Sequence, residues 1–184
     1  MLNIPNMVMI GGNSRNAGKT TLACRIISKF AASNKVIAFK VTSVRPGEED
    51  MHGSHNEVIP FSGYSIIEEL NPHSHKDTSK MLKAGANRVF YIRAEDDFVE
   101  RAILDFINQY NKNQPLICES RSMRDLVAPG LFLMMIRLPA VVSAKDVTQY
   151  LSKADHISYN FENQHETEQL IERLNFNNGK FLFI

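Results

Sequence analysis

Residues 7–30 read MVMIGGNSRNAGKTTLACRIISKF, and this stretch decides the fold. Its opening Met-Val-Met-Ile is an apolar run that is typical of a strand covered on both faces. A pair of glycines ends the run, and after Thr20 the apolar residues recur at helical spacing. A strand, a glycine-bearing turn and a helix that opens with Gly18-Lys19-Thr20 together predict a phosphate-binding loop, or P-loop.

The chemistry of such a loop suits an anion. Backbone N–H groups of residues 13–21, turned inward, make an anion-binding nest, and the positive end of the helix dipole points at the same place. The Lys19 ammonium can reach the terminal phosphates of a nucleotide, and the Thr20 hydroxyl can ligate Mg²⁺. The expected nucleotide-binding residues in this loop are Gly12, Asn13, Ser14, Asn16, Ala17, Gly18, Lys19, Thr20 and Thr21.

The spacing of the glycines departs from the common pattern G-x-x-x-x-G-K-[ST]. That pattern places its first glycine at position 13, which is Asn13, whereas Gly12 precedes Gly18 with five residues between them. Either the loop is longer than usual by a residue, or Asn13 takes the place of the glycine. The second reading is physically open because Asn tolerates left-handed backbone angles better than most residues.

Strand and helix patterns alternate along the rest of the chain. Strand-like runs occupy 36–39, 88–93, 115–118, 130–138 and 155–159, and 180–184 can add an edge strand. Helical patterns occupy 75–83, 95–110, 143–151 and 164–174, whereas 60–70 fits a short helix or a strand. The polar stretch 41–59 is expected to be a long loop beside the P-loop. The alternation predicts one α/β domain over residues 1–184, with a mostly parallel sheet and helices on both faces.

Charged residues at the ends of strands and helices supply the other candidates. Glu119 follows the strand 115–118, where a carboxylate can hold Mg²⁺ or its water while Thr20 ligates from the P-loop. We therefore predict Lys19 and Glu119 as catalytic residues, and Thr20 and Glu119 as metal ligands. Arg121 either neutralises phosphate charge near this point or faces water. The run 76–78, at the start of a helix, is interpreted as a cap region of solvated polar residues, with contact to a bound substrate as the alternative.

The G-x5-G-K-T-T loop resembles the branch of P-loop NTPases that includes dethiobiotin synthetase and the signal-recognition GTPases. The whole chain most resembles the molybdopterin-guanine dinucleotide biosynthesis adaptor family, the B protein of that pathway. Besides the P-loop, the resemblance rests on Lys40 at the end of the second strand and on the His- and acid-containing loop after it. It also rests on the stretch that runs from 75–78 to 84–89 and on the segment 116–120. It covers roughly two thirds of the chain.

This resemblance implies Mg²⁺-dependent binding of GTP rather than ATP, with slow hydrolysis. It also implies a homodimer that helps a partner enzyme of molybdenum cofactor biosynthesis to attach a guanine nucleotide to molybdopterin. In the dethiobiotin-synthetase branch, an Asn at the end of a late strand reads the base, which makes Asn160 the matching candidate here. The fragments 143–146 and 152–155 imitate the guanine-reading N/T-K-x-D signature.

Two other functions fit the same residues. An ATP-dependent ligase or small-molecule kinase would carry its acceptor on the 41–59 loop, with Lys40 between the γ-phosphate and the acceptor. A non-catalytic binding module would use the nucleotide only to support a fold for a partner. The same loop holds His52 and His55, which either ligate a metal or are solvated.

The composition argues against several classes of protein. A net charge of +1 gives no sign of nucleic-acid binding, and the longest apolar runs, such as 131–136, are too short to cross a membrane. No signal-peptide pattern is visible at the N-terminus. Cys24 and Cys118 lie inside predicted elements without metal-binding spacing. We therefore expect reduced, buried thiols and a cytoplasmic protein.

Overall fold

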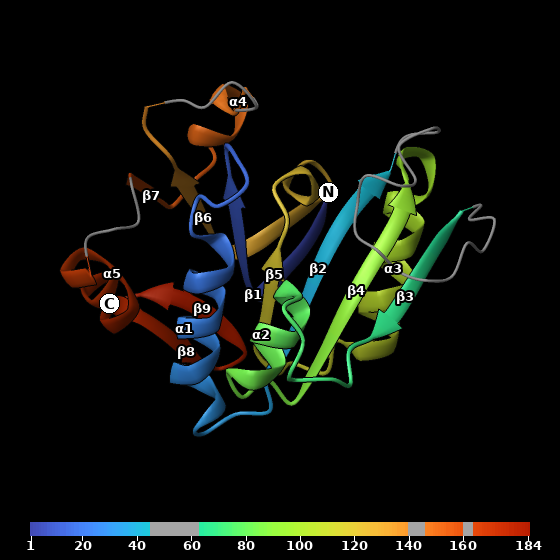
Figure 1. Ribbon diagram of the computed structural model, residues 1–184, viewed down its shortest axis with the longest axis horizontal. Helices are drawn as coiled ribbons and strands as arrows, with labels where there is room; N and C mark the ends of the chain where they lie inside the picture. The colour runs from blue at the N-terminus through green and yellow to red at the C-terminus, as the bar shows by residue number, and fades with distance from the viewer. Residues whose placement is uncertain (45–62, 140–145, 160–163) are drawn as a thin grey trace.

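A seven-stranded sheet runs through the part of the chain that the computed structural model describes, residues 1–44, 63–139, 146–159 and 164–184 (Figure 1). Its strand order is β3-β4-β2-β5-β1-β6-β7. Neighbouring strands are parallel except β3 and β4, which pair antiparallel at one edge. The strands are β1 (Leu2–Gly12), β2 (Ile37–Val44), β3 (Tyr64–Glu68), β4 (Arg88–Glu95), β5 (Leu116–Glu119), β6 (Val127–Ile136) and β7 (His156–Tyr159).

Helices cover both faces of this sheet. One face carries α1 (Lys19–Ala31), α2 (Asp77–Lys83) and α5 (Gln164–Arg173), and the opposite face carries α3 (Val99–Tyr110) and the short α4 (Thr148–Leu151). The 3₁₀ turns η2 (Asp96–Phe98) and η3 (Ser122–Asp125) precede α3 and β6. A hairpin of β8 (Leu174–Asn177) and β9 (Lys180–Phe183) packs on the α1 face. Among the described helices, none is both long and apolar enough to cross a membrane.

Alternation along the central strands sends side chains into two cores. Val8 of β1 packs into the core under α1, whereas its neighbour Met7 belongs to the core under α3. Both are fully buried, because helices cover both faces of the strand. The ring of Phe106 anchors α3 to the sheet by packing against Phe39 and Phe90 of the central strands. The α/β class, the mostly parallel sheet and the helices on both faces are thus confirmed.

Two predictions around the 41–59 loop change. β2 continues to Val44 and pairs with β4 along its whole length, so the first residues of the predicted loop belong to a strand. The segment 60–70, which fits a helix or a strand from its pattern, contributes β3. This strand is antiparallel and lies at the sheet edge beside β4.

The predictions for the ends of α3 and for the C-terminus also need correction. Glu95 closes β4 and a 3₁₀ turn follows, so α3 begins only at Val99. The segment 180–184 does not extend the main sheet, because β9 pairs with β8 instead. The reason is local: Asn178 and Gly179 have φ angles of 50° and 71°, and two consecutive left-handed residues make a tight type I′ hairpin turn.

Replacing Phe106 with Ala tests the core under α3. The Phe106 ring is fully buried, and its centroid lies 4.5, 5.3 and 5.1 Å from those of Phe39, Phe90 and Tyr110. Truncation leaves a cavity, so urea unfolding should show a loss of about 3–5 kcal/mol in the free energy of unfolding. Leu104→Ala, on the exposed side of the same helix, is the control and should cost below about 1 kcal/mol. Equal losses for the two variants would contradict this packing.

Candidate functional site

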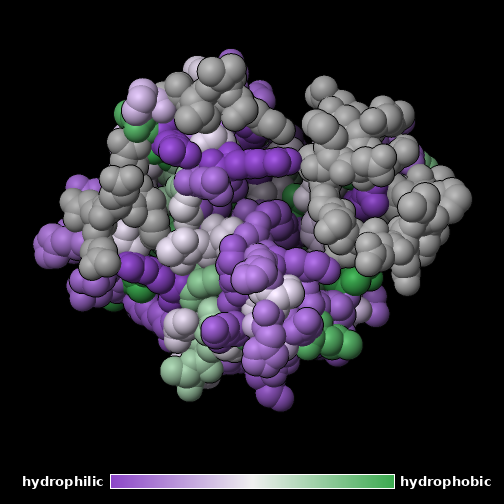
Figure 2. Space-filling view, viewed as in Figure 1, coloured by the Kyte–Doolittle hydropathy of each residue, from purple (hydrophilic) through white to green (hydrophobic). Residues whose placement is uncertain are grey.

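Charged residues converge at the sheet edge where β5 ends. β5 lies between β1 and β2, and Glu119 is in register with Ile10 on one side and Lys40 on the other. Hydrophilic residues gather over the N-terminal ends of α1 and α2, which open at this edge (Figure 2). Open α/β sheets bind their ligands beyond the carboxyl ends of the strands. The topology therefore selects this edge as the candidate site.

The loop that connects β1 to α1 has the backbone shape of an anion-binding nest. Asn16 and Gly18 have φ angles of 58° and 90°. Left-handed residues among right-handed ones turn successive N–H groups toward one concavity. Gly12 is needed for close approach, because a Cβ there would lie 2.9 Å from the carbonyl oxygen of Met135 and 3.1 Å from Cδ of Lys19.

Lys19 folds over this loop. Its Nζ donates a hydrogen bond to the carbonyl oxygen of Ser14 at 2.7 Å. Burial lowers the pKa of Lys19, and the nearby Glu119 carboxylate opposes part of that shift. The ammonium is therefore held inside the concavity that the loop amides form.

Asn13 makes hydrogen bonds to β6 and the residue after it, which the glycine spacing does not predict. Its backbone N–H donates to the carbonyl oxygen of Met135 at 3.3 Å. Its side-chain Nδ2 donates to the carbonyl oxygen of Arg137 at 3.1 Å, and its Oδ1 accepts from the Arg137 N–H at 3.0 Å. The residue thus continues the ladder between β1 and β6 and does not adopt a positive φ. Asn13 does not replace a left-handed glycine, so the reading of a longer loop holds, and the amides expected to face an anion begin at Ser14.

Thr20 and Glu119 meet although they lie far apart in the sequence. Thr20 Oγ1 donates to Glu119 Oε2 at 2.7 Å, and Glu119 is only 4% exposed. A hydroxyl and a carboxylate side by side offer the oxygen ligands that Mg²⁺ takes in proteins. The pair therefore fits the ion for which the sequence predicts it, while the magnesium role itself remains a prediction.

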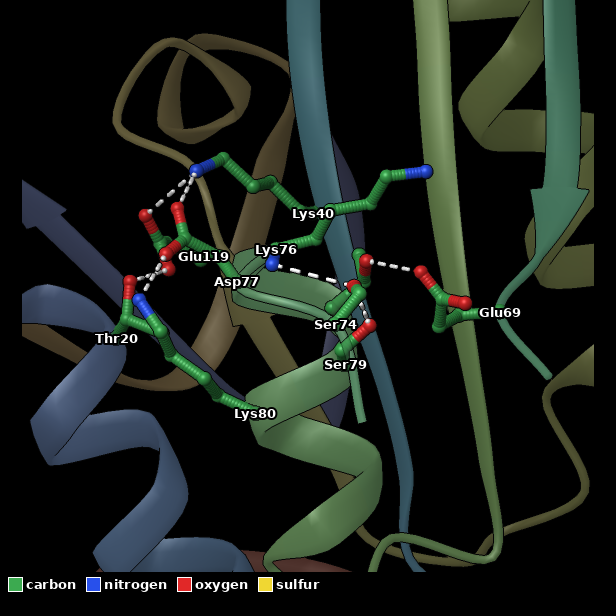
Figure 3. Close-up of polar contacts among 10 residues, drawn as sticks. Thr20, Lys40, Glu69, Ser74, Lys76, Asp77, Ser79, Lys80 and Glu119 are labelled. Carbon is green, nitrogen blue, oxygen red and sulfur yellow. Dashed lines mark hydrogen bonds and ion pairs between the residues drawn. The ribbon is translucent and has the colours of Figure 1, made fainter. Parts of the chain in front are cut away.

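Lys40 and Asp77 complete the charge cluster (Figure 3). Lys40 Nζ lies 3.3 Å from Glu119 Oε1 and 2.5 Å from Asp77 Oδ2, and Lys80 Nζ lies 3.2 Å from Asp77 Oδ1. Burial alone would lower the pKa of Lys40, but the two carboxylates outweigh it and leave that pKa raised. Burial alone would raise the pKa of Asp77, but Lys40 and Lys80 outweigh it and leave that pKa lowered.

Asp77 is a site residue that the sequence does not single out, because the run 76–78 is interpreted first as a cap region and only second as a substrate contact. The start of α2 is fixed by a polar cluster: Thr78 Oγ1 donates to Glu69 Oε2 at 2.9 Å, and the hydroxyl oxygens of Ser74 and Ser79 lie 2.5 Å apart (Figure 3). This cluster turns the first residue of α2 toward Lys40. Lys40, which follows an apolar run, indicates that a carboxylate lies nearby. Only the packing of α2 shows that this carboxylate is Asp77.

Arg121 lies just beyond β5 and carries a buried guanidinium. Its Nε and Nη1 have no hydrogen-bond partner within the ranges that the structure describes. The guanidinium carbon lies 5.2 Å from the centroid of the Tyr150 ring. Its charge also helps to lower the pKa of Lys19, after the larger effect of burial. A buried polar group without a partner needs an explanation, and this placement favours charge neutralisation over exposure to water.

The remaining predicted residues either lie outside the described part of the chain or have another role in the fold. Asn160, His52 and His55 lie outside the described residues, as does most of the fragment 143–146. In the fragment 152–155, Asp155 Oδ2 accepts the N–H of Phe132 at 2.7 Å and so fastens the start of β7 to β6.

The predictions on metal ligands and on the two cysteines can be compared with the structure over the described residues. Within them, no group of three or more His, Cys, Asp and Glu side chains gathers as a metal site. Cys24 and Cys118 are free thiols, and Cys118 is buried as predicted, whereas Cys24 is only partly buried, which corrects the prediction for that residue.

Comparisons with known proteins address the fold. No protein-family model matches the chain, and neither does any curated protein. Among solved structures, the chain is similar to LpxK from Aquifex aeolicus, whose crystal structure is titled an "apo" form in complex with ATP. The TM-score is 0.52 at 13% identity, over 98% of this chain and 54% of that one, so this chain spans about half the length of LpxK. The likeness shows that this chain shares the α/β fold of that part of LpxK, and it leaves the resemblance to the molybdopterin adaptor family unconfirmed.

Two glycine substitutions test the roles of Asn13 and Asn16. Asn13→Gly removes the side chain that pairs with Arg137 and should lower the free energy of unfolding by about 1–3 kcal/mol in urea. Asn16→Gly is the matched variant: its φ is positive, so the change should be neutral or stabilising by up to about 1 kcal/mol. A stabilising Asn13→Gly would mean that Asn13 merely replaces a glycine.

Proposed function

We propose that the protein binds the phosphates of a nucleoside triphosphate on residues 12–21, with Mg²⁺ between Thr20 and Glu119. The observation that carries this proposal is the 2.7 Å contact between Thr20 Oγ1 and Glu119 Oε2, at the N-terminus of α1 and beside the loop that encloses Lys19. A lysine and a hydroxyl in the first turn of a helix, after a nest of amides, suit a phosphate chain. The similarity in fold to a protein crystallised with ATP supports the proposal.

Each side chain of the cluster has a separate role in this proposal. Lys19 neutralises the terminal phosphates, and the backbone amides from Ser14 to Thr21 surround the phosphate that adjoins the terminal ones. Thr20 and Glu119 would hold Mg²⁺, which would supply positive charge to the phosphate oxygens. Arg121 adds positive charge from the end of β5.

The same geometry favours slow hydrolysis. Glu119 is shared by Thr20 and Lys40, and Asp77 is shared by Lys40 and Lys80. A carboxylate engaged with a cation is a weak base toward water. In the described part of the site, both carboxylates are engaged in this way.

The finer functional predictions rest on the resemblance alone. They are the preference for GTP over ATP, the role as an adaptor in guanylylation of the molybdenum cofactor, and the homodimer. Nucleotide selectivity is the first of these to measure, because it discriminates between guanine-dependent and adenine-dependent functions.

A second candidate is transfer of the terminal phosphate to an acceptor, as in a ligase or small-molecule kinase. The observation that favours it is the position of Lys40, 3.3 Å from Glu119 and bridged to Asp77 on the side of α2. ATP hydrolysis that rises only when a small acceptor is added would favour this candidate over a nucleotide-binding adaptor.

Lys19→Ala tests phosphate binding. Loss of a charge-assisted contact of about 1.5–3 kcal/mol should weaken ATP and GTP binding about 10- to 100-fold, measured by titration calorimetry with Mg²⁺. Lys35→Ala, which removes an exposed lysine before β2, is the matched control and should keep wild-type affinity. Equal affinity for Lys19→Ala and wild type would contradict the proposal.

Arg121→Met tests the buried guanidinium. It removes two buried N–H groups that have no hydrogen-bond partner among the described residues, so the free energy of unfolding should rise by about 1 kcal/mol or more. It also removes a cation from the phosphate site, so nucleotide affinity should fall about 10-fold. A purely structural Arg121 would give a loss of stability instead, with affinity unchanged.

A further inference from the structure

Both oxygens of the buried Glu119 carboxylate are engaged by this chain's own side chains. Oε2 accepts from the Thr20 hydroxyl at 2.7 Å, and Oε1 lies 3.3 Å from Lys40 Nζ. Glu119 is 4% exposed. A carboxylate at that depth is costly without a cation beside it, and Lys40 supplies that positive charge.

Lys40 and the proposed Mg²⁺ need the same carboxylate. A cation held by Thr20 and Glu119 would lie close to the Lys40 ammonium, and like charges at such a separation repel. The contact between Lys40 and Glu119 and the binding of a metal cation by Glu119 therefore oppose one another.

Asp77 gives Lys40 a second partner. Asp77 Oδ2 lies 2.5 Å from Lys40 Nζ, so Lys40 can lose Glu119 and still be paired. Figure 3 shows the Lys40 ammonium joined by dashed lines to both carboxylates, which come from α2 and from the end of β5. Hydrogen bonds of Ser74 and Thr78 fix the start of α2, so Asp77 stays in place as a partner when Lys40 gives up Glu119.

We infer that Lys40 is a resident counter-ion that neutralises Glu119 in the absence of Mg²⁺ and releases it to the metal while keeping its ion pair with Asp77. Lys40 then sets the preference of the site between a metal-free triphosphate and its magnesium complex. With Lys40 in place, Glu119 does not repel the metal-free phosphates. This inference rests on the proposed function and names a specificity determinant within that site.

The test compares nucleotide affinity with EDTA and with saturating Mg²⁺, by titration calorimetry with ATP and GTP. The magnesium factor is the affinity with Mg²⁺ divided by the affinity with EDTA. Lys40→Met should lower the affinity in EDTA and raise the magnesium factor about 10-fold or more, which is a common size of coupling between sites. Asp77→Asn should do the opposite and lower the factor by about 5-fold or more, because Lys40 then has only Glu119 as a partner.

Lys83→Met is the matched control, since it removes the same charge from the exposed last turn of α2. Its magnesium factor should stay within about threefold of wild type. Thermal unfolding checks that each variant is folded. If Lys40→Met does not fold, Asp77→Asn still tests the inference independently.

Three results would overturn the inference. They are a Lys40→Met factor no higher than that of Lys83→Met, an Asp77→Asn factor that rises or stays unchanged, and a wild type that binds neither nucleotide. The first two leave the proposed function intact, whereas the third overturns the proposed function as well.

Discussion

The buried carboxylate of Glu119 is the constraint on which the rest of the site depends. It ends the central strand β5, and it is tied to α1 through Thr20 and to β2 through Lys40. A carboxylate at 4% exposure is costly without hydrogen bonds and a cation. Satisfying this one group therefore brings the P-loop helix, the second strand and, through Asp77, helix α2 to the same point of the sheet.

The sequence predicts the parts of this site that are local. Strand, glycines, Lys19, Thr20 and the apolar stripe of α1 are contiguous, so short-range periodicity and turn chemistry suffice to place them. Glu119 is predictable because an acid at the end of an apolar strand must emerge at the carboxyl edge of a parallel sheet. These inferences need no knowledge of the strand order.

The sequence does not predict what depends on strand order or on long-range packing. Asn13 bonds Arg137 and Lys40 meets Asp77, and such partners are visible only once β6 lies beside β1 and α2 covers β2. The C-terminal hairpin is a different case, because its signal is local. The left-handed pair Asn178-Gly179 makes the tight turn that pairs β9 with β8 rather than with the main sheet.

The central claim is that the loop before α1 holds the phosphates of a nucleotide. A crystal structure with a non-hydrolysable triphosphate and Mg²⁺ tests it most directly. The account predicts phosphate oxygens on the amides of residues 14–21 and on Lys19 Nζ, with the metal between Thr20 Oγ1 and the Glu119 carboxylate. A nucleotide bound away from this loop, or a metal that leaves Glu119 paired with Lys40, would contradict it.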